Sequence, residues 1–412
     1  MAKSLFAAIW FRIVLVFAMA LPMLVLYAIS TLGPFLVRDL RFEAELLGYL
    51  VMSAFGIAAI LSLWAGAFVD RLGTRRALAV LFFAVALAFA LIATVEDYYS
   101  LVAAAAICGI AQALANPVTN LLIAQHVSPE KKATVVGFKQ SGVQLAALFA
   151  GLILPVIATQ YGWHAAFGIV VPVAILFGIT TPFIAPRKPS GTRKAFTVPL
   201  PNVLLLRLMA IQFCVGIALS AFVTFLPTFA VGQGMALSVA GSLIAVFGVM
   251  GILSRITLTP LGARMKDESL LLIVLIAIAA CAIAVTMTAN ADSHWPLWAG
   301  AVGMGLTAVG TNAIAMSMLI RDAAFGPVAT ASGFVSVAFF GGFASGPPLY
   351  GGFSNYSGNP QSSWGLLIGV LLCGCLMALG LASARRRKAP TPAPTGAVQR
   401  ATTAKVQEPA EP

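Results

Sequence analysis

Two basic residues lie inside stretches that are otherwise apolar and rich in small side chains. One is Lys139, in "VVGFKQSGVQLAAL" (135–148), and the other is Arg255, in "GVMGILSRITLTP" (248–260). Residues three or four apart share a face of a helix. The expected faces hold Gly142, Ala146 and Ala150 beside Lys139, and Gly241, Ala245, Gly248 and Thr259 beside Arg255. A buried cation without a partner costs several kcal/mol, so both side chains are candidates for a function.

No acidic residue within these stretches offers a counter-ion. Every Asp and Glu lies in a loop, at the edge of an apolar stretch or in the C-terminal tail. We therefore expect the missing partner to be the substrate, an anion, with Gln140 and Gln144 adding neutral hydrogen-bond donors. Two alternatives make the cations structural. Lys139 could snorkel to the nearest surface, and Arg255 could pair with backbone carbonyls.

Polar residues also recur at helical spacing in four other apolar stretches. Such stripes predict faces that line a watery pathway, and the alternative is hydrogen bonding between packed helices. The stripes are Tyr27 and Thr31, then Gln112, Asn116 and Asn120, then Gln212, Ser220 and Thr224, then Thr307 and Thr311. The predicted substrate pathway consists of Tyr27, Thr31, Gln112, Asn116, Lys139, Gln140, Gln144, Gln212, Thr224, Arg255 and Asn312.

Composition predicts the elements that must position these residues. Of the 412 residues, 60% are hydrophobic and 9% are charged, and the mean hydropathy is +0.98. Soluble domains contain about a quarter charged residues, and about 20 apolar residues cross the hydrocarbon core of a bilayer. The chain is therefore predicted to be an all-α membrane protein with twelve transmembrane helices. The expected spans are 12–36, 46–69, 76–95, 98–124, 133–158, 164–185, 203–230, 236–261, 269–290, 295–320, 329–352 and 364–384.

The net charge of +12 indicates membrane topology rather than nucleic-acid binding. With a cytoplasmic N-terminus, only Arg38 and Arg41 fall on the outer side, as the positive-inside rule requires. We expect a bacterial-type cytoplasmic (inner) membrane protein with both termini in the cytoplasm. Its expected partners are the lipid bilayer and a small-molecule substrate, with no nucleic acid. The inner basic residues are Arg71, Arg75, Arg76, Lys131, Lys132, Arg187, Lys188, Arg193, Lys194, Arg264, Lys266, Arg321 and Arg385–Lys388.

The spans fall into two related halves. "ATVVGF" (133–138) recurs as "ATASGF" (329–334), and Asn116 matches Asn312, both at an offset of 196 residues. This offset predicts parallel repeats, and therefore two pseudo-symmetric six-helix bundles. The expected units are an N-terminal bundle at 1–185, a basic, proline-rich cytoplasmic loop at 186–202, a C-terminal bundle at 203–384 and a disordered cytoplasmic tail at 385–412.

The sequence offers no constellation that predicts an enzyme. The five cysteines lie in apolar spans without a metal-binding spacing. No Ser/His/Asp or Cys/His group stands at catalytic spacing, and no Walker loop is present. We expect no metal and no cofactor, and we expect a monomer. The N-terminus runs directly into the first span, which favours a retained helix over a removable signal peptide.

The loop "GAFVDRLGTRRAL" (66–78) resembles the signature loop of the major facilitator superfamily. The matching residues are Gly66, Asp70, Arg71, Gly73 and Arg75, and the departures are Phe68 and Thr74. The resemblance covers about residues 5–385. It implies the superfamily fold, with these residues as a conformational latch in which Asp70 faces the N-terminal end of the eleventh span. The "KQSG" run at 139–142 is also similar to fifth spans of cyanate-permease-like, anion-transporting branches.

Together these features predict a secondary active or facilitative transporter that works by alternating access. The expected substrate is a small organic or inorganic anion, carboxylate-like in its chemistry. One alternative is an efflux transporter for an amphipathic drug-like or metabolite compound, for which acidic residues in the spans would be expected. Another is a non-transporting membrane receptor or assembly subunit, which would bind a ligand or partner without flux.

Overall fold

The computed structural model describes residues 2–184, 200–265, 267–326 and 328–388, and these are almost entirely helical. The N-terminal part contains α1 (Ala2–Leu40), η1 (Ala44–Leu46), α2 (Leu47–Leu72), α3 (Thr74–Ile92), α4 (Tyr98–His126), α5 (Pro129–Leu152), α6 (Leu154–Gly168) and α7 (Val170–Ile184). The C-terminal part contains α8 (Val203–Gly232), α9 (Leu237–Ala240), α10 (Ser242–Arg264), α11 (Glu268–Thr286), α12 (Trp295–Arg321), η2 (Ala323–Phe325), α13 (Val328–Ser357) and α14 (Pro360–Lys388).

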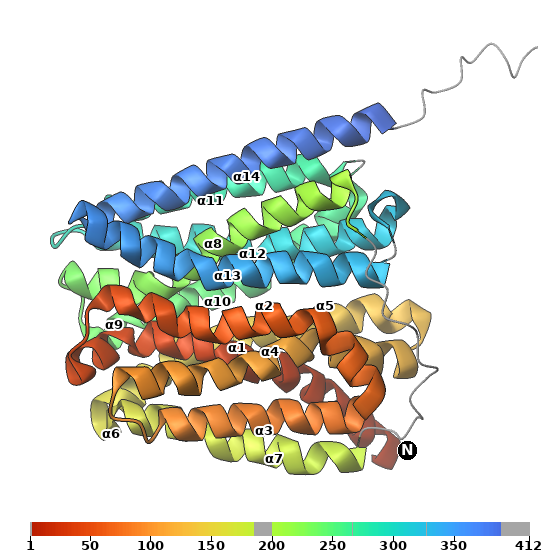
Figure 1. Cartoon of the computed structure of the whole chain (residues 1–412), viewed down its shortest axis with the longest axis horizontal. Coiled ribbons are helices and arrows are strands. Elements are labelled where there is room, and N and C mark those ends of the chain that lie inside the picture. Colours follow the sequence, from red (N-terminus) through yellow and green to blue (C-terminus); the bar gives the residue numbers. More distant parts are fainter. Residues whose placement is uncertain (1, 185–199, 266, 327, 389–412) are drawn as a thin grey trace, which may run out of the picture.

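The long helices run side by side, so the molecule has two ends (Figure 1). We call the end where α1 begins and α14 finishes the termini face, at the right of Figure 1, and the opposite end the far face. Large aromatic side chains are exposed at helix ends on the far face, where interfacial Trp and Tyr normally mark a membrane boundary. They are Tyr99, Tyr161, Trp295 and Tyr356.

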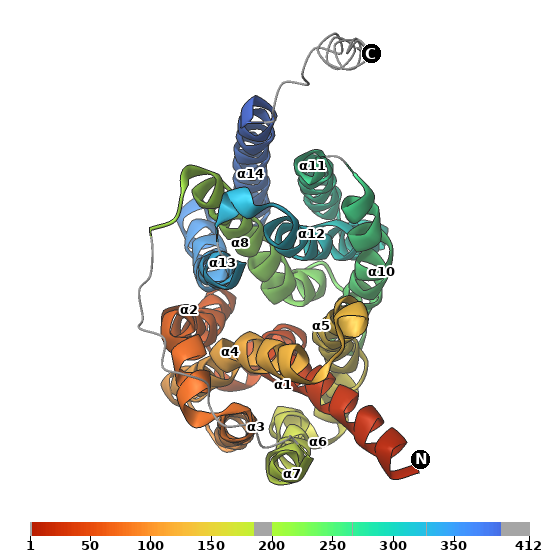
Figure 2. The ribbon, with the colours of Figure 1, turned by 90° about the vertical axis from the view of Figure 1, so that its right-hand side faces the viewer.

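The helices form two bundles, α1–α7 and α8–α14, which Figure 2 shows one below the other. In the first bundle α1 packs against α5, α2 against α4, and α3 against α4 and α7. The second bundle repeats the pattern, with α8 against α13, α10 against α12, and α11 against α12 and α14. The predicted all-α membrane fold of two pseudo-symmetric bundles is therefore confirmed. The residue boundaries of the units stay a prediction.

Eleven helical segments of the described chain are long and apolar enough to cross a membrane. The expected span at 329–352 corresponds to α13, which is rich in glycine, serine and proline. It packs lengthwise between α2 and α8 (Figure 1). Its small residues permit close approach to both neighbours.

Two of the expected spans are interrupted. The span at 133–158 runs through α5 into the first part of α6, and the chain then turns at Gly162. The φ of Gly162 is 83° and its ψ is 159°, a conformation that is open essentially to glycine alone. The span at 236–261 begins as the single turn α9 and continues as α10. The turn at Gly162 lies in the gap between the expected spans 133–158 and 164–185.

The two bundles meet along three helix pairs, which are α1 with α8, α2 with α13, and α5 with α10. At the far face a Cβ on Gly48 of α2 would lie 2.7 Å from the backbone of Pro347 on α13. Toward the termini face, the Cβ positions of Gly66 on α2 and Gly333 on α13 meet no atom within 4 Å. The bundles are packed together at the far face and diverge toward the termini face.

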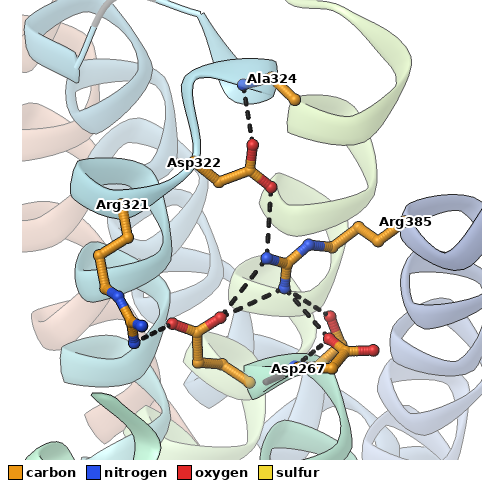
Figure 3. Close-up of polar contacts among 7 residues, drawn as sticks. Asp267, Arg321, Asp322, Ala324 and Arg385 are labelled. Atoms are coloured by element: carbon orange, nitrogen blue, oxygen red, sulfur yellow. Dashed lines mark hydrogen bonds and ion pairs between the residues drawn. The ribbon is translucent and has the colours of Figure 1, made fainter. Parts of the chain in front are cut away.

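An ionic cluster joins the termini-face ends of α11, α12 and α14 (Figure 3). Arg385 pairs with Asp267 at 3.1 Å, with Glu268 at 3.4 Å and with Asp322 at 3.2 Å. Arg321 pairs with the other oxygen of Glu268 at 2.8 Å. Arg385 thus ties Asp267, Glu268 and Asp322, at the starts of α11 and η2, to α14, and Arg321 ties α12 to α11 through Glu268.

The cluster lies at the end of the second bundle, where α14 is helical through Lys388 and the ion pairs of Arg385 hold this end of the helix. The predicted tail beyond it, 389–412, lies outside the described residues. So do Lys266 and most of the basic loop, including Arg187, Lys188, Arg193 and Lys194.

Candidate functional site

Lys139 is fully buried between α4 and α5, with 0% of its surface exposed. Its Nζ donates to Asn120 Oδ1 at 2.6 Å, to Thr119 Oγ1 at 2.8 Å and, more weakly, to Asn116 Oδ1 at 3.4 Å. An ammonium has three N–H donors and no acceptor, so three neutral oxygens of α4 take up all of them. The snorkelling alternative is therefore wrong, because the head group turns into the bundle.

Arg255 reaches from α10 in the second bundle to α5 in the first. Its Nη1 donates to the backbone carbonyl of Gln140 at 3.1 Å and to Gln140 Oε1 at 2.9 Å. Gln140 Nε2 in turn lies 3.4 Å from Asn116 Oδ1, the oxygen that Lys139 also approaches. The two cations therefore belong to one network that crosses the bundle interface. This cation network consists of Asn116, Thr119, Asn120, Lys139, Gln140 and Arg255.

The cation network contains two positive charges and, among the described residues, no acid. Lys139 and Arg255 repel one another across the interface. The ion pairs of the described chain lie elsewhere, at Arg38, Arg321 and Arg385 near helix ends. Neutral hydrogen bonds offset only part of the cost of removing two cations from water. The site therefore carries an excess of positive charge that an anion would neutralise.

Small residues hold α5 and α10 together on the far-face side of the network. A Cβ on Gly151 of α5 would lie 2.4 Å from the backbone nitrogen of Ala245. A Cβ on Gly248 would lie 2.9 Å from the carbonyl oxygen of Gln144, and one on Gly251 would lie 2.7 Å from Gln144 Oε1. The backbones of α5 and α10 are thus in contact on the far-face side. Toward the termini face, the polar side chains of the cation network lie between the two helices.

Three buried polar atoms at or beside the network have no hydrogen-bond partner within the part of the chain that the structure describes. They are Arg255 Nε, Gln112 Oε1 and Gln144 Oε1. Buried polar atoms are normally paired, so each marks a position where a ligand or water would bind. Arg255 Nε is a donor and suits an anion, whereas the two glutamine oxygens are acceptors.

Other predicted pathway residues lie near the network or form a separate pair. Tyr27 is 2% exposed and is close enough to Arg255 for an electrostatic interaction. Gln212 on α8 and Asn312 on α12 contact one another, with Asn312 Nδ2 at 3.3 Å from Gln212 Oε1. Gln112 contacts the sulfur of Met23 through Nε2 at 3.8 Å. Their role in a pathway stays a prediction.

Thr31 and Thr224 do not join the network. The Thr31 hydroxyl donates to the Tyr27 carbonyl at 2.9 Å, and the Thr224 hydroxyl donates to the Ser220 carbonyl at 2.7 Å, each within its own helix. Both side chains are at most 1% exposed. Intrahelical bonding satisfies these hydroxyls, so they present no free hydrogen-bonding proton to a pathway in this structure.

Thr119 contributes to the site although it belongs to no predicted stripe. It lies next to Asn120 on α4, and its hydroxyl also donates to the Ala115 carbonyl at 2.6 Å. The one feature of the sequence that could have identified Thr119 is its position about one turn after Asn116, in a helix without Asp, Glu, Lys or Arg. Which α4 side chains meet Lys139 depends on how α4 and α5 pack, and a periodic pattern does not carry that information.

The predicted latch lies at the end of α2 and the start of α3. Gly73 terminates α2 with a φ of 78°, which explains the glycine at this turn. Asp70 and Arg71 are exposed at the termini face. The Cβ position of Gly66 meets no atom within 4 Å. The contact between Asp70 and the start of α13 stays a prediction for a state in which the termini face is closed.

Comparisons with known proteins agree with this architecture. A family model described as the Major Facilitator Superfamily matches residues 15–329. The hexuronate transporter of Bacillus subtilis (strain 168) is 26% identical over 168 residues, which cover 40% of this chain and 40% of the relative. A crystal structure of a bacterial homologue of the human lysosomal transporter Spinster, inward-facing and occupied, matches with a TM-score of 0.70 at 15% identity. That match covers 93% of this chain and 98% of the other and shows a common fold.

Proposed function

This chain belongs to the Major Facilitator Superfamily and is a multi-pass membrane transporter, and on that premise we propose that it carries a small organic anion by alternating access. The expected charged group of the substrate is a carboxylate. One observation carries the proposal: Lys139 is buried in the first bundle and Arg255 is half-buried in the second, both with neutral protein partners only, within the described residues. A negatively charged substrate would supply the missing partner.

The proposed orientation places the termini face in the cytoplasm. Arg71, Arg75 and Arg321 lie at this end, as the positive-inside rule favours for cytoplasmic loops. With this orientation the described state is open toward the cytoplasm and closed toward the outside. An anion would then enter or leave the cation network from the cytoplasmic side.

The same charges suggest how a substrate would drive the conformational change. Lys139 belongs to the first bundle and Arg255 to the second, so their repulsion opposes closure of the termini face. An anion between them replaces repulsion with two attractions. Because a ligand shifts an equilibrium only by binding one state better than the other, an anion that contacts both bundles favours the state in which they approach.

The hexuronate transporter adds support for an organic acid. Hexuronates are sugar-derived carboxylates, so that relative is named for a substrate with the charge expected here. The alignment covers 40% of each chain, and the substrate of the present protein is therefore argued from its own residues. The same reasoning accommodates exchange, facilitated flux or cotransport with a proton.

Uptake into proteoliposomes tests the proposal. The purified protein would be screened for counterflow of a panel of carboxylates that includes D-glucuronate, alongside lipophilic cations. Wild type should move at least one carboxylate, and Arg255→Gln and Lys139→Gln should each reduce that flux at least tenfold. Melting temperatures of both variants near the wild-type value would show that folding is intact.

The screen also separates the competing functions. Flux of lipophilic cations without carboxylates would favour efflux of amphipathic compounds, and ligand-dependent stabilisation without any flux would favour a receptor. Normal carboxylate uptake by both glutamine variants would show that the buried cations do not bind the substrate.

A further inference from the structure

Lys139 fixes the orientation of two asparagine amides on α4. Because an ammonium donates and never accepts, the oxygens of Asn116 and Asn120 must face it, at 3.4 and 2.6 Å. The NH2 groups of both amides therefore point away from the lysine. Within the described residues neither NH2 group donates to a protein acceptor, and Asn120 is exposed on a helix that is otherwise largely buried. The amides offer neutral N–H donors beside the two cations.

Gln112 adds a hydrogen-bond acceptor on the same face of α4, one turn before Asn116. Its Nε2 contacts Met23, and its buried Oε1 has no donor in the described part of the chain. Gln112, Asn116 and Asn120 are spaced four residues apart, so they share one face of the helix. This face, which we call the α4 amide face, combines unpaired donors with an unpaired acceptor.

The chemistry of the α4 amide face selects among anions. A second carboxylate only accepts hydrogen bonds, so it would leave Gln112 Oε1 unpaired and place negative charge beside that oxygen. An apolar substrate body would leave all three amides unpaired, at a cost of about 1–3 kcal/mol for each buried group. A hydroxyl donates and accepts, so it matches both kinds of unpaired group.

We propose that the transported anion is hydroxylated, with Arg255 binding its carboxylate and the α4 amide face binding its hydroxyls. Lys139 is a positioning residue in this scheme, since its three bonds to α4 turn the amide N–H groups toward the ligand. The substrate class is a polyhydroxylated carboxylate such as a sugar acid, as opposed to an unsubstituted, aromatic or inorganic anion. The inference rests on the proposed transport of an organic anion and specifies which organic anions fit.

Two probes of similar size and equal charge test the inference. D-Glucuronate carries hydroxyls on a six-membered ring, and cyclohexanecarboxylate carries none. In proteoliposomes, wild type should favour glucuronate by about 100-fold in kcat/KM, since two or more hydrogen bonds distinguish the probes. Asn120→Ala should lower kcat/KM for glucuronate about tenfold, mainly through KM, and should leave kcat/KM for cyclohexanecarboxylate nearly unchanged. The preference for glucuronate should therefore fall by the same factor of about ten.

Thr119→Val is the matched comparator. It removes another oxygen that holds Lys139 at 2.8 Å but removes no amide donor. It should therefore change transport of both probes by the same factor and preserve their ratio. Asn120→Gln, which keeps the amide, should recover part of the preference that Asn120→Ala loses.

The outcomes separate this inference from the proposed function. Equal transport of both probes by wild type would overturn hydroxyl recognition and leave anion transport standing. An equal loss for both probes in Asn120→Ala would show that Asn120 serves only to hold Lys139, which also overturns the inference. Failure of every carboxylate in the panel would overturn the proposed function itself.

Discussion

Arg255 on α10 and Gln140 on α5 are joined twice, through the Gln140 backbone carbonyl at 3.1 Å and through its Oε1 at 2.9 Å. The contact crosses from one bundle to the other. Because both acceptors are neutral, they position the guanidinium without neutralising it, and Nε has no acceptor among the described residues. A fixed cation with an unpaired donor is suited to bind an anion that arrives and leaves.

Gln140→Glu supplies the counter-ion that the site lacks. Its carboxylate would take the place of Oε1 beside Arg255 and form a buried, charge-assisted pair. We expect a melting temperature equal to or above that of wild type, and anion affinity reduced at least tenfold. Gln140→Ala removes the side-chain contact without adding charge, so it should retain more transport than Gln140→Glu. Isothermal titration and proteoliposome flux measure both effects.

The control for the added charge is Gln160→Glu, at an exposed position on α6. It should leave transport unchanged. Wild-type affinity in Gln140→Glu would show that an internal counter-ion does not compete with the substrate, and the argument from unpaired buried charge would then be lost.

The fold was predictable because only a few backbone structures can cross a bilayer. Backbone groups in hydrocarbon must bond within a helix, so apolar length and the 196-residue offset of Asn116 and Asn312 were enough to predict two bundles. The turn at Gly162 falls in the gap between the expected spans 133–158 and 164–185, where Thr159, Gln160 and Gly162 interrupt the apolar residues.

The site was predictable only where the signal is local. Lys139 and Arg255 stand out because a cation in an apolar run is conspicuous in any sequence. Thr119 was missed because its contact with Lys139 spans 20 residues and depends on helix packing. For Thr31, periodicity places the residue on a polar stripe but does not reveal that its hydroxyl bonds to the backbone of its own helix.

Gly151→Ala tests the close packing of α5 and α10 at the far face. Its Cβ would lie 2.4 Å from Ala245 N and 2.6 Å from Gly241 O, and both are backbone atoms that cannot rotate away. Over-packing of this kind costs about 1–3 kcal/mol, so the melting temperature should fall by a few degrees. Gly369→Ala on α14, which meets no atom within 4 Å, should be neutral or slightly stabilising because alanine favours helix. Identical melting temperatures for the two variants would contradict the described junction.

Arg385→Ala tests the ionic cluster at the termini face. The Arg385 side chain is 16% exposed and faces three carboxylates, and Glu268 is only 4% exposed. Its loss leaves those carboxylates with one cation, Arg321, so we expect destabilisation of about 1–3 kcal/mol at low salt. The deficit should shrink at 1 M salt through screening. Arg386→Ala, at an exposed neighbour, should change stability by no more than about 0.5 kcal/mol. A deficit that does not respond to salt would point to lost packing instead of lost charge.

A disulfide between α2 and α13 tests whether the bundles must separate at the far face. The Cβ position of Gly56 lies 4.0 Å from the Cβ of Ala344, within the range of about 3.5–4.5 Å that disulfides require. Gly56 lies about 14 Å along α2 from its far-face end, in the half that would open for outward access. In a background with the native cysteines replaced, Gly56→Cys with Ala344→Cys should cross-link on oxidation, stop transport and recover when reduced.

A cross-link within one bundle provides the control for this experiment. The Cβ position of Gly374 on α14 is 3.3 Å from the Cβ of Cys214 on α8, just under that range, so Gly374→Cys with Cys214 retained should also cross-link after a small outward shift of α14. Both helices belong to the second bundle and move together if the bundles rock as rigid bodies, so this disulfide should leave transport intact. Inhibition by both cross-links would mean that the helices rearrange inside a bundle. Inhibition by neither would mean that α2 and α13 stay in contact throughout the cycle, which is incompatible with opening at the far face.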